Sequence, residues 1–313
     1  MATELQPVIA NPPELDPGAE ISASNEFETT TTHGEVVVAG TTVEYTIESP
    51  PEDHIVYEGL AIIAPGFGGF KRTSRPLRHE MALAGVVSVS YSPVRRDDHS
   101  LWSRLARSQQ AHADTITAVA SDIADQDFSD TDVPPVDVTR RVLLPHSMGG
   151  LATAQHASDT PHGTTEAIIN LAAAGFGSPT IPELLETIPK NLHHAVFKEL
   201  IPFVMSGKVD VTPQNFWRFL HYYGVNPTRT IGEIYACLST DVRPTVWQLG
   251  RQGVLSAFLA FEHDALIPPH DNLGDTVDYY EVMPGAGHMA PQLKAKEVAQ
   301  GVVDTMEVLD IAA

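Results

Sequence analysis

This sequence has almost no cysteine and few basic side chains. Its single cysteine, Cys237, cannot form a disulfide within the chain, so nothing in the sequence points to an oxidising compartment. A lone cysteine is usually a small core residue, and we interpret Cys237 in this way. The 19 lysines and arginines are outnumbered by 40 aspartates and glutamates, which gives a formal net charge of −21. This charge disfavours nucleic-acid backbones and anionic membrane surfaces as partners.

Long apolar runs are also missing. No stretch approaches the roughly 20 apolar residues that a membrane-spanning helix needs. The N-terminus lacks the basic start and the following apolar stretch of a secretory signal. Residues 1–28 are instead rich in proline, alanine and acidic side chains without any lysine or arginine, which predicts a flexible acidic tail. We therefore expect a cytoplasmic protein.

The body of the chain alternates between strand and helix patterns. Residues 35–39 and 42–47 are rich in β-branched side chains and flank Gly40, which predicts a hairpin. Short runs that are apolar at successive positions predict strands buried on both faces. Strands of this kind are predicted at residues 60–64, 86–91, 141–145, 166–172 and 254–261, and a last strand is predicted at residues 277–282. The sequence therefore predicts an α/β fold with a mostly parallel, eight-stranded type of sheet and helices on both faces.

The alternation stops between residues 174 and 249. This segment has no clear strand pattern and combines short helix patterns with prolines, glycines and bulky apolar side chains. We interpret residues 174–249 as a helical cap inserted into a core of residues 29–173 and 250–313. Most of its aromatic side chains are expected to form the core of the cap itself. Some of them are candidates to contact an apolar substrate, including Phe216, Trp217 and Tyr222.

A serine stands where one predicted strand ends and a helix begins. The apolar run 142–145 ends at Pro145, and His146-Ser147-Met148-Gly149-Gly150 follows. A serine at such a sharp turn has its hydroxyl pushed clear of the sheet, with helix N–H groups directed towards it. The two glycines allow the helix to begin close to the strand. Ser147 is therefore a candidate nucleophile, although a serine that only caps the helix is the simpler alternative.

A serine nucleophile needs a base, and the base needs a carboxylate to orient it. In a parallel sheet these groups meet at the carboxyl ends of the strands. Asp264 follows the predicted strand 254–261, and His288 follows the strand 277–282. Glu262 is a rival acid, and His146 and His263 are rival bases. We favour His288 because His146 adjoins the nucleophile, from which its side chain should point away, and His263 adjoins the proposed acid.

Stabilising a tetrahedral intermediate also requires N–H donors for its oxyanion. The amide of Met148, at the start of the helix, is one candidate. The glycine-rich loop Pro65-Gly66-Phe67-Gly68-Gly69 supplies a second, for which we favour the amide of Phe67.

From about residue 34 to its end, the chain resembles the α/β-hydrolase superfamily, in its serine esterase and lipase-like branch. The resemblance is carried by the glycine-rich loop, by His146-Ser147-Met148-Gly149-Gly150, by Asp264 with its trailing prolines and by Gly287-His288. It implies a Ser-Asp-His hydrolase, usually without a cofactor, with a cap inserted after the sixth strand. A serine at this position argues against the dehalogenase and epoxide-hydrolase branches, which have aspartate there.

Two residues depart from the family pattern without removing a catalytic atom. Pro145 replaces the first glycine of the usual G-x-S-x-G, and Pro65 replaces a histidine that often begins the oxyanion loop. Because proline fixes φ and lacks an N–H, Pro145 is expected to shift the turn slightly.

The sequence as a whole predicts a cofactor-independent, metal-free serine hydrolase that acts on carboxylic esters or related acyl compounds. Its partner is expected to be a small, at least partly apolar substrate. One alternative is an acyltransferase or perhydrolase, in which another acceptor replaces water at the same site. The other is a non-catalytic binding protein that keeps the fold.

Overall fold

The structure is a computed structural model, and it describes most of the chain outside the N-terminal tail and the middle of the predicted cap. The described residues are 27–66, 71–94, 101–126, 134, 136–160, 163–177, 240–264, 266–270, 273 and 275–312, with only the backbone described for 101–108. Most of the predicted tail, most of the predicted cap and the loop residues 67–70 lie outside them. The domain boundaries that the sequence predicts therefore stay a prediction.

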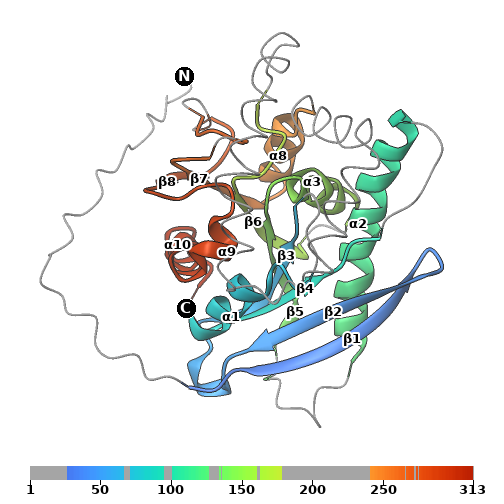
Figure 1. Cartoon of the computed structure of the whole chain (residues 1–313), viewed down its shortest axis with the longest axis vertical. Coiled ribbons are helices and arrows are strands. Elements are labelled where there is room, and N and C mark those ends of the chain that lie inside the picture. Colours follow the sequence, from blue (N-terminus) through green and yellow to red (C-terminus); the bar gives the residue numbers. More distant parts are fainter. Residues whose placement is uncertain are drawn as a thin grey trace, which may run out of the picture.

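The core of the fold is one eight-stranded sheet with the order β1-β2-β4-β3-β5-β6-β7-β8 (Figure 1). β1 pairs with β2 and β2 with β4 in antiparallel orientation, and all other pairs are parallel. The strands are β1 (Thr30–Val38), β2 (Thr41–Ser49), β3 (Tyr57–Ala64), β4 (Val86–Tyr91), β5 (Asp137–Pro145), β6 (Thr165–Leu171), β7 (Leu255–Phe261) and β8 (Tyr279–Met283). The predicted mostly parallel sheet is confirmed.

The predicted hairpin is the β1–β2 pair at one edge of the sheet (Figure 1). The connecting residues Ala39 and Gly40 both have positive φ, at 49° and 81°. Two positive φ values give the turn a twist that matches the twist of the strands, and glycine adopts this conformation without a steric penalty.

Helices cover both faces of the sheet (Figure 1). α1 (Arg75–Leu83), α9 (Ala290–Leu293) and α10 (Ala295–Val308) pack on one face, and α2 (Leu101–Asp125) and α3 (Gly149–Asp159) pack on the other. A 3-10 turn, η1 (Glu52–His54), precedes β3. α8 (Arg243–Gly250) lies in the segment predicted as cap and contacts α3 and β7. None of the helices in the described ranges is long and apolar enough to span a membrane.

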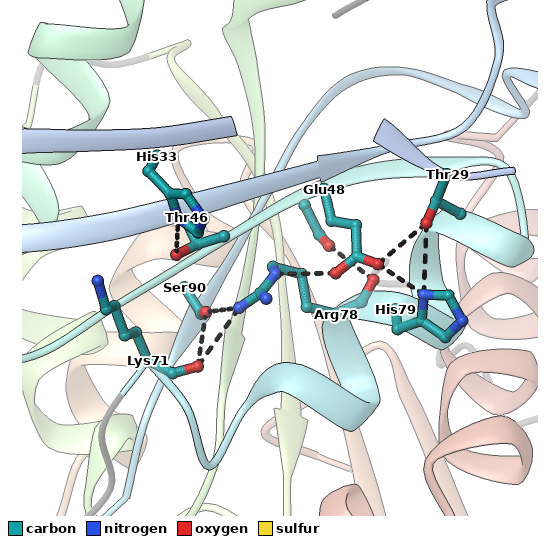
Figure 2. Close-up of polar contacts among 9 residues, drawn as sticks. Thr29, His33, Thr46, Glu48, Lys71, Arg78, His79 and Ser90 are labelled. Carbon is teal, nitrogen blue, oxygen red and sulfur yellow. Dashed lines mark hydrogen bonds and ion pairs between the residues drawn. The ribbon is translucent and has the colours of Figure 1, made fainter. Parts of the chain in front are cut away.

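A buried polar cluster lies between α1 and the strands β2 and β4 (Figure 2). The guanidinium of Arg78 donates to the carboxylate of Glu48, with Nε 3.1 Å from Oε2, and to the hydroxyl of Ser90 at 2.6 Å. Arg78 and Ser90 also donate to the carbonyl of Lys71, at 3.3 and 3.2 Å. Burial lowers the pKa of Arg78, and the Glu48 charge opposes this shift. Lys71 lies two residues after Gly69, the last residue of the glycine-rich loop, so the cluster holds the chain shortly after that loop.

Candidate active site

Ser147 occupies the strained turn that the sequence predicts between a strand and a helix. Its φ is +53°, in the left-handed region that residues other than glycine rarely adopt. The preceding amide, that of His146, donates to the carbonyl of Ala64 at the end of β3. The Ser147 carbonyl accepts a bond from the amide of Ala174, 2.7 Å away, in the loop that follows β6. Bonds to the segments on both sides therefore hold the turn in its strained conformation.

Small residues allow the turn to approach β3 closely. A Cβ on Gly149 would lie 2.4 Å from the carbonyl oxygen of Ala64, and a Cβ on Gly150 would lie 2.8 Å from the Cβ of Ala173. Both distances are too short for a real side chain. Pro145 is the last residue of β5 and pairs with Ala64 of β3. The pairing of the two strands therefore extends to this residue although proline has no N–H.

The side chains of Ser147, His288 and Asp264 form one chain of hydrogen bonds at the carboxyl ends of β5, β7 and β8. Nε2 of His288 lies 3.0 Å from Oγ of Ser147, and Nδ1 lies 2.8 Å from Oδ2 of Asp264. A carboxylate only accepts hydrogen bonds, so Nδ1 of His288 carries the proton. In the neutral imidazole Nε2 is then an acceptor for the Ser147 hydroxyl. This is the protonation state that a general base requires.

Asp264 is held in place by the backbone that follows it. Its Oδ1 accepts the amides of Leu266 and Ile267, both at 2.8 Å, while Oδ2 faces His288. The carboxylate is 3% exposed, so its hydrogen bonds are not in competition with bulk water. Both oxygens are thus occupied in a way that orients the carboxylate towards the imidazole.

The rival acid and the rival base on the same loop face elsewhere. The Glu262 carboxylate accepts the amide of Gly285 at 2.7 Å and is half exposed. The His263 side chain is 66% exposed and lies 3.8 Å from Glu262. Glu262 therefore braces the turn after β8, and neither side chain takes part in the hydrogen-bond chain of Ser147.

His146, the other rival base, is buried against His288. Its Nε2 lies 2.9 Å from the His288 carbonyl oxygen, and the two ring centroids are 4.9 Å apart. Burial, and to a smaller extent the neighbouring His288, lower the pKa of His146 to about 3. Sequence reasoning considered this residue only as a base and missed the contact. The signal available was a polar side chain beside the nucleophile, where the end of a buried strand usually carries an apolar one.

Met148, the predicted source of an oxyanion donor, caps the start of α3 directly after Ser147. The next two amides, of Gly149 and Gly150, donate to the carbonyls of His146 and Ser147, at 2.9 and 3.1 Å. The Met148 amide has no backbone acceptor within the described part of the chain. The other predicted donor, Phe67, and the predicted substrate-contacting side chains Phe216, Trp217 and Tyr222 lie outside the described residues.

The described ranges contain no group of three or more His, Cys, Asp or Glu side chains that could hold a metal ion. Cys237, the single cysteine, lies outside these ranges.

Comparison with solved structures shows that the chain has the α/β-hydrolase fold. A bromoperoxidase from Bacillus anthracis aligns with 88% of this chain and 100% of its own length at a TM-score of 0.58 and 13% identity. An epoxide hydrolase variant from Solanum tuberosum aligns with 89% and 100% at a TM-score of 0.58 and 14% identity. An esterase from Exiguobacterium antarcticum aligns with 87% and 98% at a TM-score of 0.56 and 12% identity. No family model and no curated protein matches the sequence.

Proposed function

We propose that this protein is a serine hydrolase that cleaves carboxylic esters or related acyl compounds through an acyl-enzyme on Ser147. The observation that supports this proposal best is the continuous chain of hydrogen bonds from Asp264 through His288 to Ser147. The positive φ of Ser147 is a second support, because residues with a strained backbone conformation are concentrated at functional sites.

In the first half of the reaction, Nε2 of His288 takes the hydroxyl proton of Ser147 while Oγ attacks the substrate carbonyl. Asp264 stabilises the imidazolium that forms. The amides of Met148 and Phe67 hold the oxyanion of the tetrahedral intermediate. The carbon–oxygen bond to the leaving group then breaks. The imidazolium gives its proton to the departing alkoxide, and an acyl-Ser147 ester remains.

The second half of the reaction repeats these steps with water. His288 takes a proton from a water molecule, whose oxygen attacks the acyl-Ser147 carbonyl. When the tetrahedral intermediate breaks down, the proton passes from His288 to Oγ of Ser147, and the carboxylic acid leaves. No cofactor or metal is needed for this sequence of steps.

The substrate is proposed to be small and at least partly apolar. This rests on the aromatic composition of the segment predicted as cap, where Phe216, Trp217 and Tyr222 are candidate contacts. The cytoplasmic location likewise stays a prediction from the sequence.

Reaction of the purified protein with a fluorophosphonate probe, read by mass spectrometry, tests the nucleophile. We expect one label, on Ser147, together with turnover of p-nitrophenyl esters. The Ser147→Ala variant should lose both. Unchanged ester turnover in Ser147→Ala would show that the nucleophile is wrongly assigned, and a wild-type protein without label or turnover would favour a binding protein.

A series of p-nitrophenyl esters of increasing chain length would measure the size of the acyl site. Product analysis with added alcohol, thiol or hydrogen peroxide would separate hydrolysis from acyl transfer. Free acid as the main product under all conditions supports a hydrolase, whereas a new ester, thioester or peracid identifies the acceptor that replaces water.

A further inference from the structure

A buried histidine outside the proposed reaction steps connects the nucleophile to the base. His146 directly precedes Ser147, and its side chain reaches the backbone of His288, 142 residues further along the chain. A carbonyl oxygen only accepts hydrogen bonds, so Nε2 of His146 is the donor in this 2.9 Å contact. His146 is therefore in the tautomer with the proton on Nε2.

The backbone of His146 is fixed on both sides. Its amide donates to the Ala64 carbonyl of β3, at 3.0 Å, and it forms a parallel bridge with Leu171 at the end of β6. Its own carbonyl accepts the amide of Gly149, at 2.9 Å. The residue is 7% exposed, so its position is set by the sheet and not by solvent.

The loop that carries His288 is held by backbone contacts on both sides of this residue. Glu262 accepts the Gly285 amide, and the amide of His263 donates to the Ala286 carbonyl at 2.8 Å. Both contacts lie before His288 in the chain, and after it the amide of Ala290 donates to the Gly287 carbonyl at 2.9 Å. The Nε2–H of His146 donates to the carbonyl of His288 itself, and the two tilted rings, with their planes 37° apart, lie against each other.

We propose that His146 is a positioning residue, which uses its Nε2–H to hold the His288 carbonyl and thereby keeps the imidazole within hydrogen-bond reach of Ser147. This proposal rests on the proposed serine hydrolase function. His146 does not contact the reacting atoms. It links the strained turn of Ser147 to the loop of the base through one side chain.

The charge state of His146 fits this role. Burial, followed by the effect of His288, lowers its pKa to about 3. It therefore stays neutral at the pH where His288 is a base, and Nε2 keeps its single proton as the donor. Because His146 is uncharged, it adds no second positive charge beside the imidazolium that forms during the reaction.

Two variants separate the hydrogen bond from the packing of the ring. His146→Phe keeps an aromatic ring but has no donor, whereas the side-chain amide of His146→Gln can reach the same carbonyl. In His146→Phe we expect kcat for a p-nitrophenyl ester to fall about tenfold to a hundredfold, because small displacements of a catalytic group have effects of this size. KM should change little, and the rate of fluorophosphonate labelling should fall with kcat. His146→Gln should recover most of the loss.

Expressing kcat per labelled Ser147 removes any effect of a smaller folded fraction. The matched control is His156→Phe, which alters another buried histidine, on α3, whose Nδ1 bonds to the hydroxyl of Thr117 on α2. It should lower the thermal midpoint by a comparable amount and leave kcat per labelled site unchanged. The proposal would be overturned if His146→Phe kept the kcat per labelled site of the wild type. It would also be overturned if the kcat per labelled site of His146→Gln were no higher than that of His146→Phe.

A measurement on the wild-type protein covers the case in which the variants fail to fold. In two-bond ¹H–¹⁵N correlation spectra of the histidine rings, His146 should stay neutral with its proton on Nε2 from pH 5 to pH 8. A proton on Nδ1, or titration near the ordinary pKa, would contradict the hydrogen bond. A wild-type protein that neither turns over esters nor reacts with the probe would contradict the proposed function. Results on the His146 variants contradict only the positioning role of His146.

Discussion

Gly66 lies directly against the nucleophile: a Cβ on this residue would be 2.7 Å from the Cβ of Ser147 and 3.0 Å from the carbonyl oxygen of His146. Gly66 is the second residue of the loop after β3 that is proposed to supply an oxyanion donor. The absence of a side chain here therefore lets two parts of the candidate site, the loop and the turn of Ser147, approach each other.

Gly66→Ala should separate these two parts. The new methyl group pushes the loop or the turn away, and we expect activity to fall about a hundredfold, together with a destabilisation of about 1–3 kcal/mol. Ester turnover and chemical denaturation measure the two effects. Gly250→Ala is the matched control, because a Cβ there meets no atom of the described residues within 4 Å. Equal activity of both variants would contradict the close approach.

Asp264→Asn tests the carboxylate that orients the base. The asparagine amide can donate to Nδ1 of His288 and so favour the wrong tautomer, for which a loss of about 10³- to 10⁴-fold in kcat is expected. Because Oδ1 can still accept the amides of Leu266 and Ile267, the fold should be preserved. Glu262→Gln is the control, since this acid accepts a backbone amide at the surface. A larger loss in Glu262→Gln than in Asp264→Asn would reverse the assignment of the acid.

Arg78→Met removes one partner of the buried ion pair under α1. The Glu48 carboxylate, 4% exposed, would then lack this partner, and a destabilisation of about 3–5 kcal/mol is expected. Arg75→Met, at an exposed position on the same helix, should change stability by less than about 0.5 kcal/mol. Urea denaturation measures both. The double variant Glu48→Gln/Arg78→Met should be less destabilised than Arg78→Met, and the opposite result would contradict a buried charge as the cause.

Stability should decrease when the pH falls from 7 to 4. Burial lowers the pKa of His146 to about 3 and of His156 to about 4, from an ordinary value of 6.5. Below pH 6.5 the unfolded chain binds protons that the folded protein does not, so stability falls until the pH reaches the folded-state pKa values. Each histidine contributes on the order of 2–3 kcal/mol to this loss at pH 4.

The thermal midpoint as a function of pH measures this effect. His156→Phe removes one of the two groups, so its midpoint should decrease less between pH 7 and pH 4 than that of the wild type. Equal pH dependence in the wild type and in His156→Phe would show that the folded protein binds the proton on His156 as readily as the unfolded chain does.

The structural neighbours share the fold but carry different names: bromoperoxidase, epoxide hydrolase and esterase. At 12–14% identity, this likeness does not transfer a reaction to the chain. The proposal of a serine hydrolase depends instead on the residues at the strand ends. Ser147 is the residue whose chemical test decides between the proposed hydrolase and a protein that only keeps the fold.

The sequence by itself determined the alternation of buried strands and helices, and with it the α/β class. It also located Ser147, Asp264 and His288 at strand ends in the order that a parallel sheet brings together. These features are local: a run of apolar residues reports burial, and glycines after a serine report a tight turn, without knowledge of distant partners.

Only the tertiary structure decided which side chains meet. The pairing of Asp264 with His288, the surface position of Glu262 and the contact of His146 with the base all depend on loops that are distant in sequence. The buried Glu48–Arg78 pair depends on the packing of α1 over β2. Charged and polar residues carry no periodic signal of burial, because what makes their burial favourable is a specific partner supplied by another part of the chain.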